Sequence, residues 1–124
     1  MNAIQELNLE LIEKASFNNF DGKLVVSELR KNRSLWTAVV MDREYYESAA
    51  KDGGCNLIKL RDLPDDMWNV DTVFILSSGK DDKLLMAVAK GWSADEISWI
   101  EGEKAGKLLG SFPAKQKILR AWWD

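Results

Sequence analysis

The chain has 124 residues, of which 46% are hydrophobic and 30% charged, and its formal net charge is −3. These values predict one globular domain over residues 1–124 and exclude a disordered or fibrous chain. The sequence contains no histidine, so it lacks the commonest general base and the commonest transition-metal ligand. Cys55 is the only cysteine, which excludes an intrachain disulfide and is typical of the reducing cytoplasm. We therefore expect no metal, no other cofactor and a cytoplasmic location.

Charge is spread unevenly along the chain. Residues 62–103 contain ten acidic and three basic side chains, whereas residues 104–124 contain five basic side chains and one acidic one. The acidic middle repels nucleic-acid phosphates, which are neutralised by clustered Lys and Arg. The N-terminus lacks the early basic residues of a signal or transit peptide, and the apolar runs are far shorter than a membrane span. We therefore expect no nucleic acid and no membrane as partners.

The first third of the chain predicts one helix and one ambiguous segment. Five apolar residues recur at helical spacing over residues 2–16 and predict a helix with one apolar stripe, formed by Ile4, Leu7, Leu11, Ile12 and Ala15. Turn-forming residues follow it. Residues 23–33 begin with Val25 and Val26, which favour a strand, and continue with residues that favour a helix. We interpret this segment as a strand that forms a hairpin with the next one.

From residue 35 onward, short apolar runs alternate with segments of helical spacing. The runs predict strands at residues 35–41, 56–60, 71–76, 96–100 and 117–123. The intervening segments predict helices at residues 43–51, 81–90 and 104–109. Strands that alternate with helices are usually parallel and joined by right-handed crossovers. The sequence therefore predicts an α/β (or α+β) fold, with a mainly parallel or mixed sheet of about five strands, flanking helices and an N-terminal helix.

The last predicted strand carries two adjacent tryptophans. Because side chains alternate along a strand, Trp122 and Trp123 point to opposite faces of the sheet. Arg120 should lie on the face of Trp122, and Ala121 on the face of Trp123. Burial of a large aromatic side chain stabilises the fold by roughly 2–3 kcal/mol. We therefore predict that at least one of the two tryptophans is buried and that deletion of residues 118–124 unfolds the domain.

One candidate site joins a strand to a helix. The loop from Ser77 to Lys80 would present backbone N–H groups to an anion, and Lys80 adds positive charge. It is not a P-loop, because Phe74 replaces the required glycine and Asp81 the required Ser or Thr. If the strands are parallel, their carboxyl ends bring acidic residues to the same edge of the sheet. One hypothesis is therefore a small-molecule or anion site, enzymatic or not, although the same residues would also serve as helix caps and solvated side chains: Asp42, Ser77, Ser78, Lys80 and Glu101.

The leading hypothesis is a non-catalytic protein-binding module, similar in kind to an immunity or adaptor protein. Six tryptophans are an unusual number for this length, and an aromatic side chain beside an arginine is typical of protein interfaces. Core packing is the alternative for each tryptophan. The predicted surface is acidic and aromatic, it would bind a protein partner or a second copy of the chain, and its candidate residues are Arg120, Trp122 and Trp92. A deep pocket at the strand ends would favour the ligand site instead, and a flat aromatic patch would favour protein binding.

Overall fold

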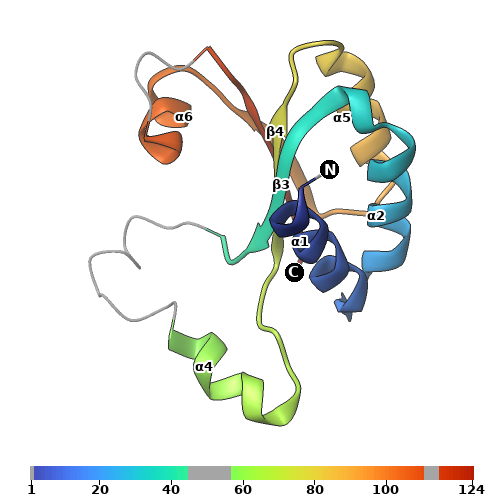
Figure 1. Ribbon diagram of the computed structural model, residues 1–124, viewed down its shortest axis with the longest axis vertical. Coiled ribbons are helices and arrows are strands. Elements are labelled where there is room, and N and C mark those ends of the chain that lie inside the picture. Colours follow the sequence, from blue (N-terminus) through green and yellow to red (C-terminus); the bar gives the residue numbers. More distant parts are fainter. Residues whose placement is uncertain (1, 45–56, 111–114) are drawn as a thin grey trace.

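The computed structural model describes residues 2–44, 57–110 and 115–124. These residues form an α+β fold with a four-stranded sheet, a two-stranded hairpin and five α-helices. Figure 1 shows three helices against one face of the larger sheet, namely α1 (Ala3–Lys14), α2 (Gly22–Lys31) and α5 (Asp82–Lys90). Helix α6 (Gly102–Leu109) lies against the other face. None of the helices in the described ranges is long and apolar enough to cross a membrane.

Four strands form the larger sheet: β3 (Trp36–Asp42), β4 (Thr72–Ser77), β5 (Glu96–Ile100) and β6 (Ile118–Trp122). Their order is β3-β4-β6-β5, and every pair of neighbours is antiparallel. The expectation of a mainly parallel or mixed sheet of about five strands is therefore wrong. Strands β4 and β5 do run parallel and are joined by α5, as the alternation of strand and helix predicts. The difference arises because β6 inserts between them and pairs antiparallel with both.

Helix α1 confirms the predicted N-terminal helix, but most of its apolar stripe faces outward. Ile4, Leu7 and Leu11 are 75%, 59% and 45% exposed. The fully buried residues of the helix are Leu9 and Ile12. The helix packs beside α2 and the edge of the sheet, so only a narrow side of it is covered.

The inward side of α1 also presents an amide to strand β3. The Gln5 side chain donates from Nε2 to the Val39 C=O at 2.8 Å and accepts from the Val39 N–H through Oε1 at 3.0 Å. It thereby satisfies both backbone groups of an edge residue, as a neighbouring strand would. Helix α1 therefore closes the β3 edge of the sheet.

The predicted strand over residues 23–33 is wrong, because residues 22–31 form helix α2. Asp21 caps this helix by accepting a hydrogen bond from the Leu24 N–H at 3.2 Å. Three residues are buried at helical spacing, and their burial outweighs the strand propensity of the two valines: Val25, Val26 and Leu29. A two-residue turn precedes the helix and joins the hairpin strands β1 (Ser16–Phe17) and β2 (Phe20–Asp21).

The predicted strand at residues 56–60 is also wrong where the structure describes it. The chain there forms helix α4 (Ile58–Asp62) and the 3-10 turn η3 (Leu63–Asp65), and no residue of either is buried. A strand needs a neighbour to satisfy its backbone, whereas a helical turn satisfies it locally. Most of the predicted helix at residues 43–51 lies outside the described residues, and Arg43 and Glu44 are not helical.

The helix-covered face of the larger sheet holds the main core. Alternate side chains of the central strands point into it, and Val73, Ile75, Leu119 and Ala121 are fully buried there. The segments 35–41, 72–76 and 118–122 share one sheet, as predicted, except that Leu35 lies in a 3-10 turn just before β3.

Trp123 confirms that the C-terminal segment belongs to this core. Its side chain is fully buried, its Nε1 donates to the Trp92 C=O at 3.2 Å, and its ring meets that of Phe20 edge-on at 4.7 Å. Its backbone N–H donates to the Asp71 C=O at 3.0 Å, which extends the pairing beyond the end of β6. Ala121 also lies in the main core, whereas Arg120 lines the groove on the opposite face, so the predicted alternation along this strand is confirmed.

Candidate functional site: a groove on the second face of the sheet

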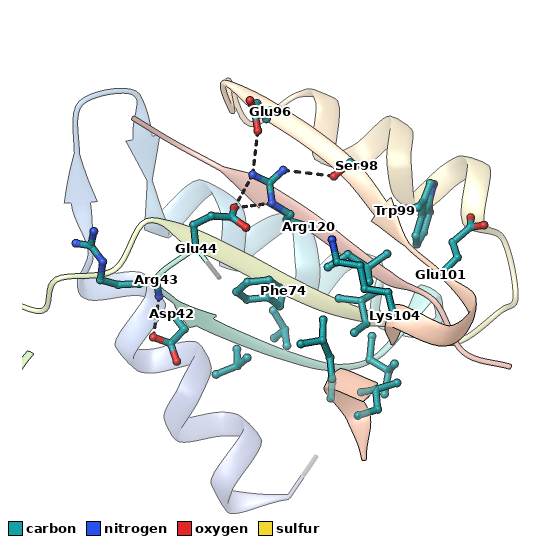
Figure 2. Close-up of a pocket in the computed structure, with 18 residues that line it drawn as sticks. Asp42, Arg43, Glu44, Phe74, Glu96, Ser98, Trp99, Glu101, Lys104 and Arg120 are labelled. Atoms are coloured by element: carbon teal, nitrogen blue, oxygen red, sulfur yellow. Dashed lines mark hydrogen bonds and ion pairs between the residues drawn. The ribbon is translucent and has the colours of Figure 1, made fainter. Parts of the chain in front are cut away.

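The face of the sheet opposite the main core carries an open groove of about 810 Å³ (Figure 2). Helix α6 covers one part of this face, where Ile100, Ala105 and Ile118 form a small second core. Leu108 and Leu109 of the same helix form a wall of the groove. The floor is apolar and draws on all four strands, through Ala38, Val40, Phe74, Leu76, Ile100 and Ile118.

The sequence of β4 explains why the floor is apolar. Val73 and Ile75 enter the main core, while Phe74 and Leu76 face the groove, so the middle of the strand is apolar on both sides. Such strands are typical of sheets with helices on both faces. Here α6 is short and covers only part of the second face. As a result, Val40 on the floor and Leu108 on the wall each remain 44% exposed.

An ion-pair cluster closes one end of the groove, and Figure 2 shows Arg120 pointing between its partners. The Arg120 guanidinium donates to Glu44 Oε2 at 2.5 Å and to Glu96 Oε2 at 2.9 Å. The side chains of Arg120 and Glu44 are only 14% and 9% exposed. Burial alone would lower the pKa of Arg120, but the hydrogen bonds to Glu96 and Glu44 outweigh it and raise that pKa. The arginine therefore stays charged and is already neutralised by carboxylates.

The polar groups at the C-terminal end of β3 are paired as well. Asp42 Oδ1 accepts from the Arg43 N–H at 2.7 Å and from the Lys59 ammonium group. The Glu44 N–H donates to Asp71 Oδ1 at 2.8 Å. These contacts fix the first residues after β3 against the segment before β4, and they hold the Glu44 carboxylate in the ion-pair cluster.

The five residues predicted as a ligand site do not come together. Ser77, Ser78, Lys80 and Glu101 share one end of the sheet, because β4 and β5 run parallel as expected. Asp42 lies at the opposite end, because β3 is antiparallel to β4, and its expected position at the same edge is wrong. Asp42 and Glu101 line the groove, at its two ends, whereas Ser77, Ser78 and Lys80 do not line it.

The loop after β4 forms a turn whose backbone groups are already bonded. Ser77 Oγ accepts from the Gly79 N–H at 2.9 Å, and Ser78 Oγ accepts from the Lys80 N–H at 3.3 Å. Asp81 caps the following helix by accepting from a backbone N–H. An anion at this loop would therefore compete with serine and aspartate oxygens for the same donors.

The acidic side chain at the far end of the groove also has a partner. Lys117 Nζ lies 3.3 Å from Glu101 Oε1 and 3.7 Å from Asp82 Oδ2. The same ammonium group stands 5.7 Å from the ring centre of Trp99. Both ends of the groove therefore carry ion pairs, and the floor between them is apolar, with Lys104 of α6 also in the lining.

The aromatic surface predicted from the sequence is only partly present. Trp92 is 2% exposed and belongs to the core, so its place on an interaction surface is wrong. Trp122 shares the face of Arg120 as predicted, but it is partly buried and does not line the groove. The exposed apolar groups of this face are instead aliphatic, chiefly Val40 and Leu108. The unbroken apolar run of β4, residues 73–76, is the signal that sequence reasoning missed, because it indicates a strand with an apolar side chain on each face of the sheet.

The chain matches no family model, no curated protein and no solved structure. Within the described ranges, no group of three or more acidic or cysteine side chains is arranged to hold a metal ion. Most acidic groups of the groove are held in ion pairs near its ends, Lys104 of α6 adds one positive charge to its lining, and the floor between them is hydrocarbon. This arrangement suits the burial of a partner's apolar side chains.

Proposed function

We propose that this protein is a non-catalytic, cytoplasmic protein-binding module, and that its groove receives an apolar segment of a partner protein. One observation supports this most directly: in the part of the chain that the structure describes, α6 leaves the apolar floor of the sheet's second face partly open, whereas three helices cover the first face. Full burial of a Val or Leu side chain stabilises by about 1.5–3 kcal/mol. Covering the exposed fractions of Val40 and Leu108 would therefore contribute about 1 kcal/mol each.

The shape of the groove favours a protein segment over a small molecule. Pockets for small molecules usually enclose about 70–90% of the ligand surface. This groove has a floor and one helical wall, so a small ligand would keep much of its surface in water. A helix or strand of a partner protein would bury one side in the groove and cover the other with its own domain.

The charge of the rim favours basic residues in that partner. The side chains of Asp42, Glu96 and Glu101 are 47%, 60% and 52% exposed at the margin of the groove. Each pairs with a lysine or arginine, and the lining as a whole carries four acidic and three basic side chains, a small acidic excess: Asp42, Glu44, Glu96 and Glu101 against Arg43, Lys104 and Arg120. Complementary charge at a rim mainly sets specificity and association rate. We therefore expect the bound segment to present apolar residues flanked by Lys or Arg.

Selection from a displayed random peptide library tests this function. The immobilised protein should enrich peptides with apolar residues and flanking Lys or Arg. Val40→Asp and Leu108→Asp place a charge on the floor and on the wall, and each should weaken the enriched peptides by about tenfold or more. Leu84→Asp is the matched control, because Leu84 is 45% exposed but lies on α5, across the sheet from the groove.

The controls separate loss of binding from loss of folding. Thermal unfolding should show that the variants remain folded, and Leu108→Asp, on a helix surface, guards against destabilisation of β3 by Val40→Asp. The proposal is contradicted if no peptide is enriched, or if the enriched peptides bind both groove variants as tightly as the parent protein.

A further inference from the structure

The two edges of the larger sheet are treated differently. At the β3 edge, the Gln5 side chain bonds both backbone groups of Val39. At the β5 edge, the described residues provide no hydrogen bond from outside the β5–β6 ladder. Edge strands usually avoid association through Lys, Pro, bulges or covering elements. Strand β5 reads Glu-Ile-Ser-Trp-Ile and contains neither Lys nor Pro.

The hydrogen-bond pattern identifies which backbone groups of β5 face outward. The Lys117 C=O accepts from Ser77 in β4 at 3.0 Å, and the Trp122 C=O accepts from Asp95 beside β5 at 2.9 Å. Odd-numbered residues of β6 therefore bond β4, and even-numbered ones bond β5. Because Ser98 is paired with Arg120, its own backbone groups face β6. The N–H and C=O groups of Ile97 and Trp99 consequently point away from the sheet.

We propose that β5 pairs antiparallel with β5 of a second copy of this chain, about a twofold axis at Ser98. This register places Ile97 opposite Trp99 of the second copy, and each such pair exchanges both of its N–H···O bonds. The twofold axis at Ser98 therefore places the two residues with outward-facing backbone groups, Ile97 and Trp99, opposite each other. A register centred on another residue leaves part of these groups unpaired.

The side chains agree with the same register. Ile97 and Trp99 pack against the main core but stay partly exposed on the edge strand, and Trp99 also reaches the end of the groove. A β-branched residue opposite an aromatic one is a favourable cross-strand pair. Glu96 falls opposite Ile100 of the second copy, and Ser98 falls opposite Ser98 of the second copy. Within β5 no like charges meet.

The pairing joins the two sheets into one continuous sheet. The twofold axis is perpendicular to the sheet, so both grooves lie on the same side of it. Just outside β5, Asp95 falls opposite Glu101 of the second copy. Because salt screens repulsion between exposed charges, dimerisation should strengthen as the salt concentration rises. The inference does not depend on what the groove binds.

Charge substitutions at Ser98 test both the dimer and its register. Ser98→Asp sets two like charges opposite each other in the dimer, while in the single chain the new carboxylate faces Arg120, which already donates to Ser98 Oγ at 3.3 Å. Ser98→Lys gives the opposite charge. We expect the parent protein to reach the mass of two chains in sedimentation equilibrium as its concentration rises. Each variant alone should remain at the mass of one chain over the same range.

An equimolar mixture of the two variants should return to the mass of two chains, because opposite charges then face each other. Thr37→Asp, on the exposed surface of the other edge strand, is the control and should dimerise like the parent. A parent protein that stays at the mass of one chain overturns the proposal. So does a Ser98→Asp variant that dimerises like the parent, or a mixture that stays monomeric.

Discussion

Replacement of Gly22 by alanine tests how closely the first two helices approach each other. A Cβ atom built on Gly22 would lie 1.9 Å from the Ile12 carbonyl oxygen and 2.6 Å from that of Ala15. Both are backbone atoms, so no side chain can rotate away. To bring the shorter contact to even 3.0 Å, the two helices would have to separate by about 1.1 Å.

The cost of that separation follows from what the two helices bury. Overpacking a core usually costs about 1–3 kcal/mol, with the upper end where neighbours cannot move. The Gly22 N–H also donates to the Ala15 C=O at 3.2 Å, and loss of that bond adds about 1 kcal/mol. We therefore expect Gly22→Ala to lower the free energy of unfolding by about 3–4 kcal/mol, and Tm by about 12–15 °C.

Urea and thermal unfolding, followed by tryptophan fluorescence and circular dichroism, measure this loss. Gly91→Ala is the matched control, because its Cβ would meet only the Val88 carbonyl oxygen at 3.3 Å and its φ of −78° suits any residue. That variant should stay within about 1 kcal/mol of the parent. Equal stability of the two variants would refute the close approach of α1 and α2.

Three further predictions concern the core, the β3 edge and acid stability. Trp123→Ala should cost about 3–5 kcal/mol in unfolding free energy, and Trp122→Ala clearly less, because only Trp123 is fully buried; equal losses would contradict the assignment. Gln5→Leu leaves the outward N–H and C=O of the edge strand unpaired, so it should cost about 1–2 kcal/mol and speed hydrogen exchange of that amide; unchanged exchange would contradict it. The pKa of Glu6 lies below its usual 4.5, chiefly because Arg30 donates a hydrogen bond to it. A carboxylate whose pKa is lower in the folded state stabilises the fold above its unfolded-state pKa, and this stabilisation is lost as pH falls through its folded-state pKa. The Glu6→Gln variant should therefore lose less Tm than the parent protein when the pH falls below 4.5. An identical acid profile of the two proteins would contradict a stabilising Glu6–Arg30 ion pair.

Elements with strong local signals were predictable from the sequence. Strands β3, β4 and β6 combine β-branched or aromatic residues with strand length. Helix α5 begins at the Asp81 cap and ends at Gly91, and helix α6 ends at Gly110 in the left-handed conformation. The helix at residues 22–31 was not predictable in this way, because its two adjacent valines favour a strand. The helix becomes evident only from the Asp21 cap and the packing against α1. In that segment tertiary burial decided the structure.

The order of the strands in the sheet could not be predicted from local sequence patterns. The alternation from β4 through α5 to β5 correctly indicates two parallel strands, but nothing within those residues shows that β6 inserts between them. The candidate site depended on that order. Once β3 and β6 run antiparallel to β4, Asp42 moves to the far end of the sheet and the predicted cluster separates.

The groove was missed for a related reason. Val40, Phe74 and Leu108 look like ordinary core residues in the sequence, but among the described residues α6 covers only part of the second face, and all three line the groove. The high tryptophan content predicted an aromatic binding surface, but Trp36, Trp92 and Trp123 are buried in the core. Exposure of aliphatic side chains is a property of the packed structure.

Amide chemical-shift mapping with an enriched peptide is the most direct test of the proposed function. If the groove is the binding surface, the largest shifts should fall on its floor and wall, at Val40, Phe74 and Leu108, and Leu108→Asp should abolish them while Leu84→Asp leaves them in place. Shifts confined to α1, α2 and α5, on the other face of the sheet, would contradict the proposed function.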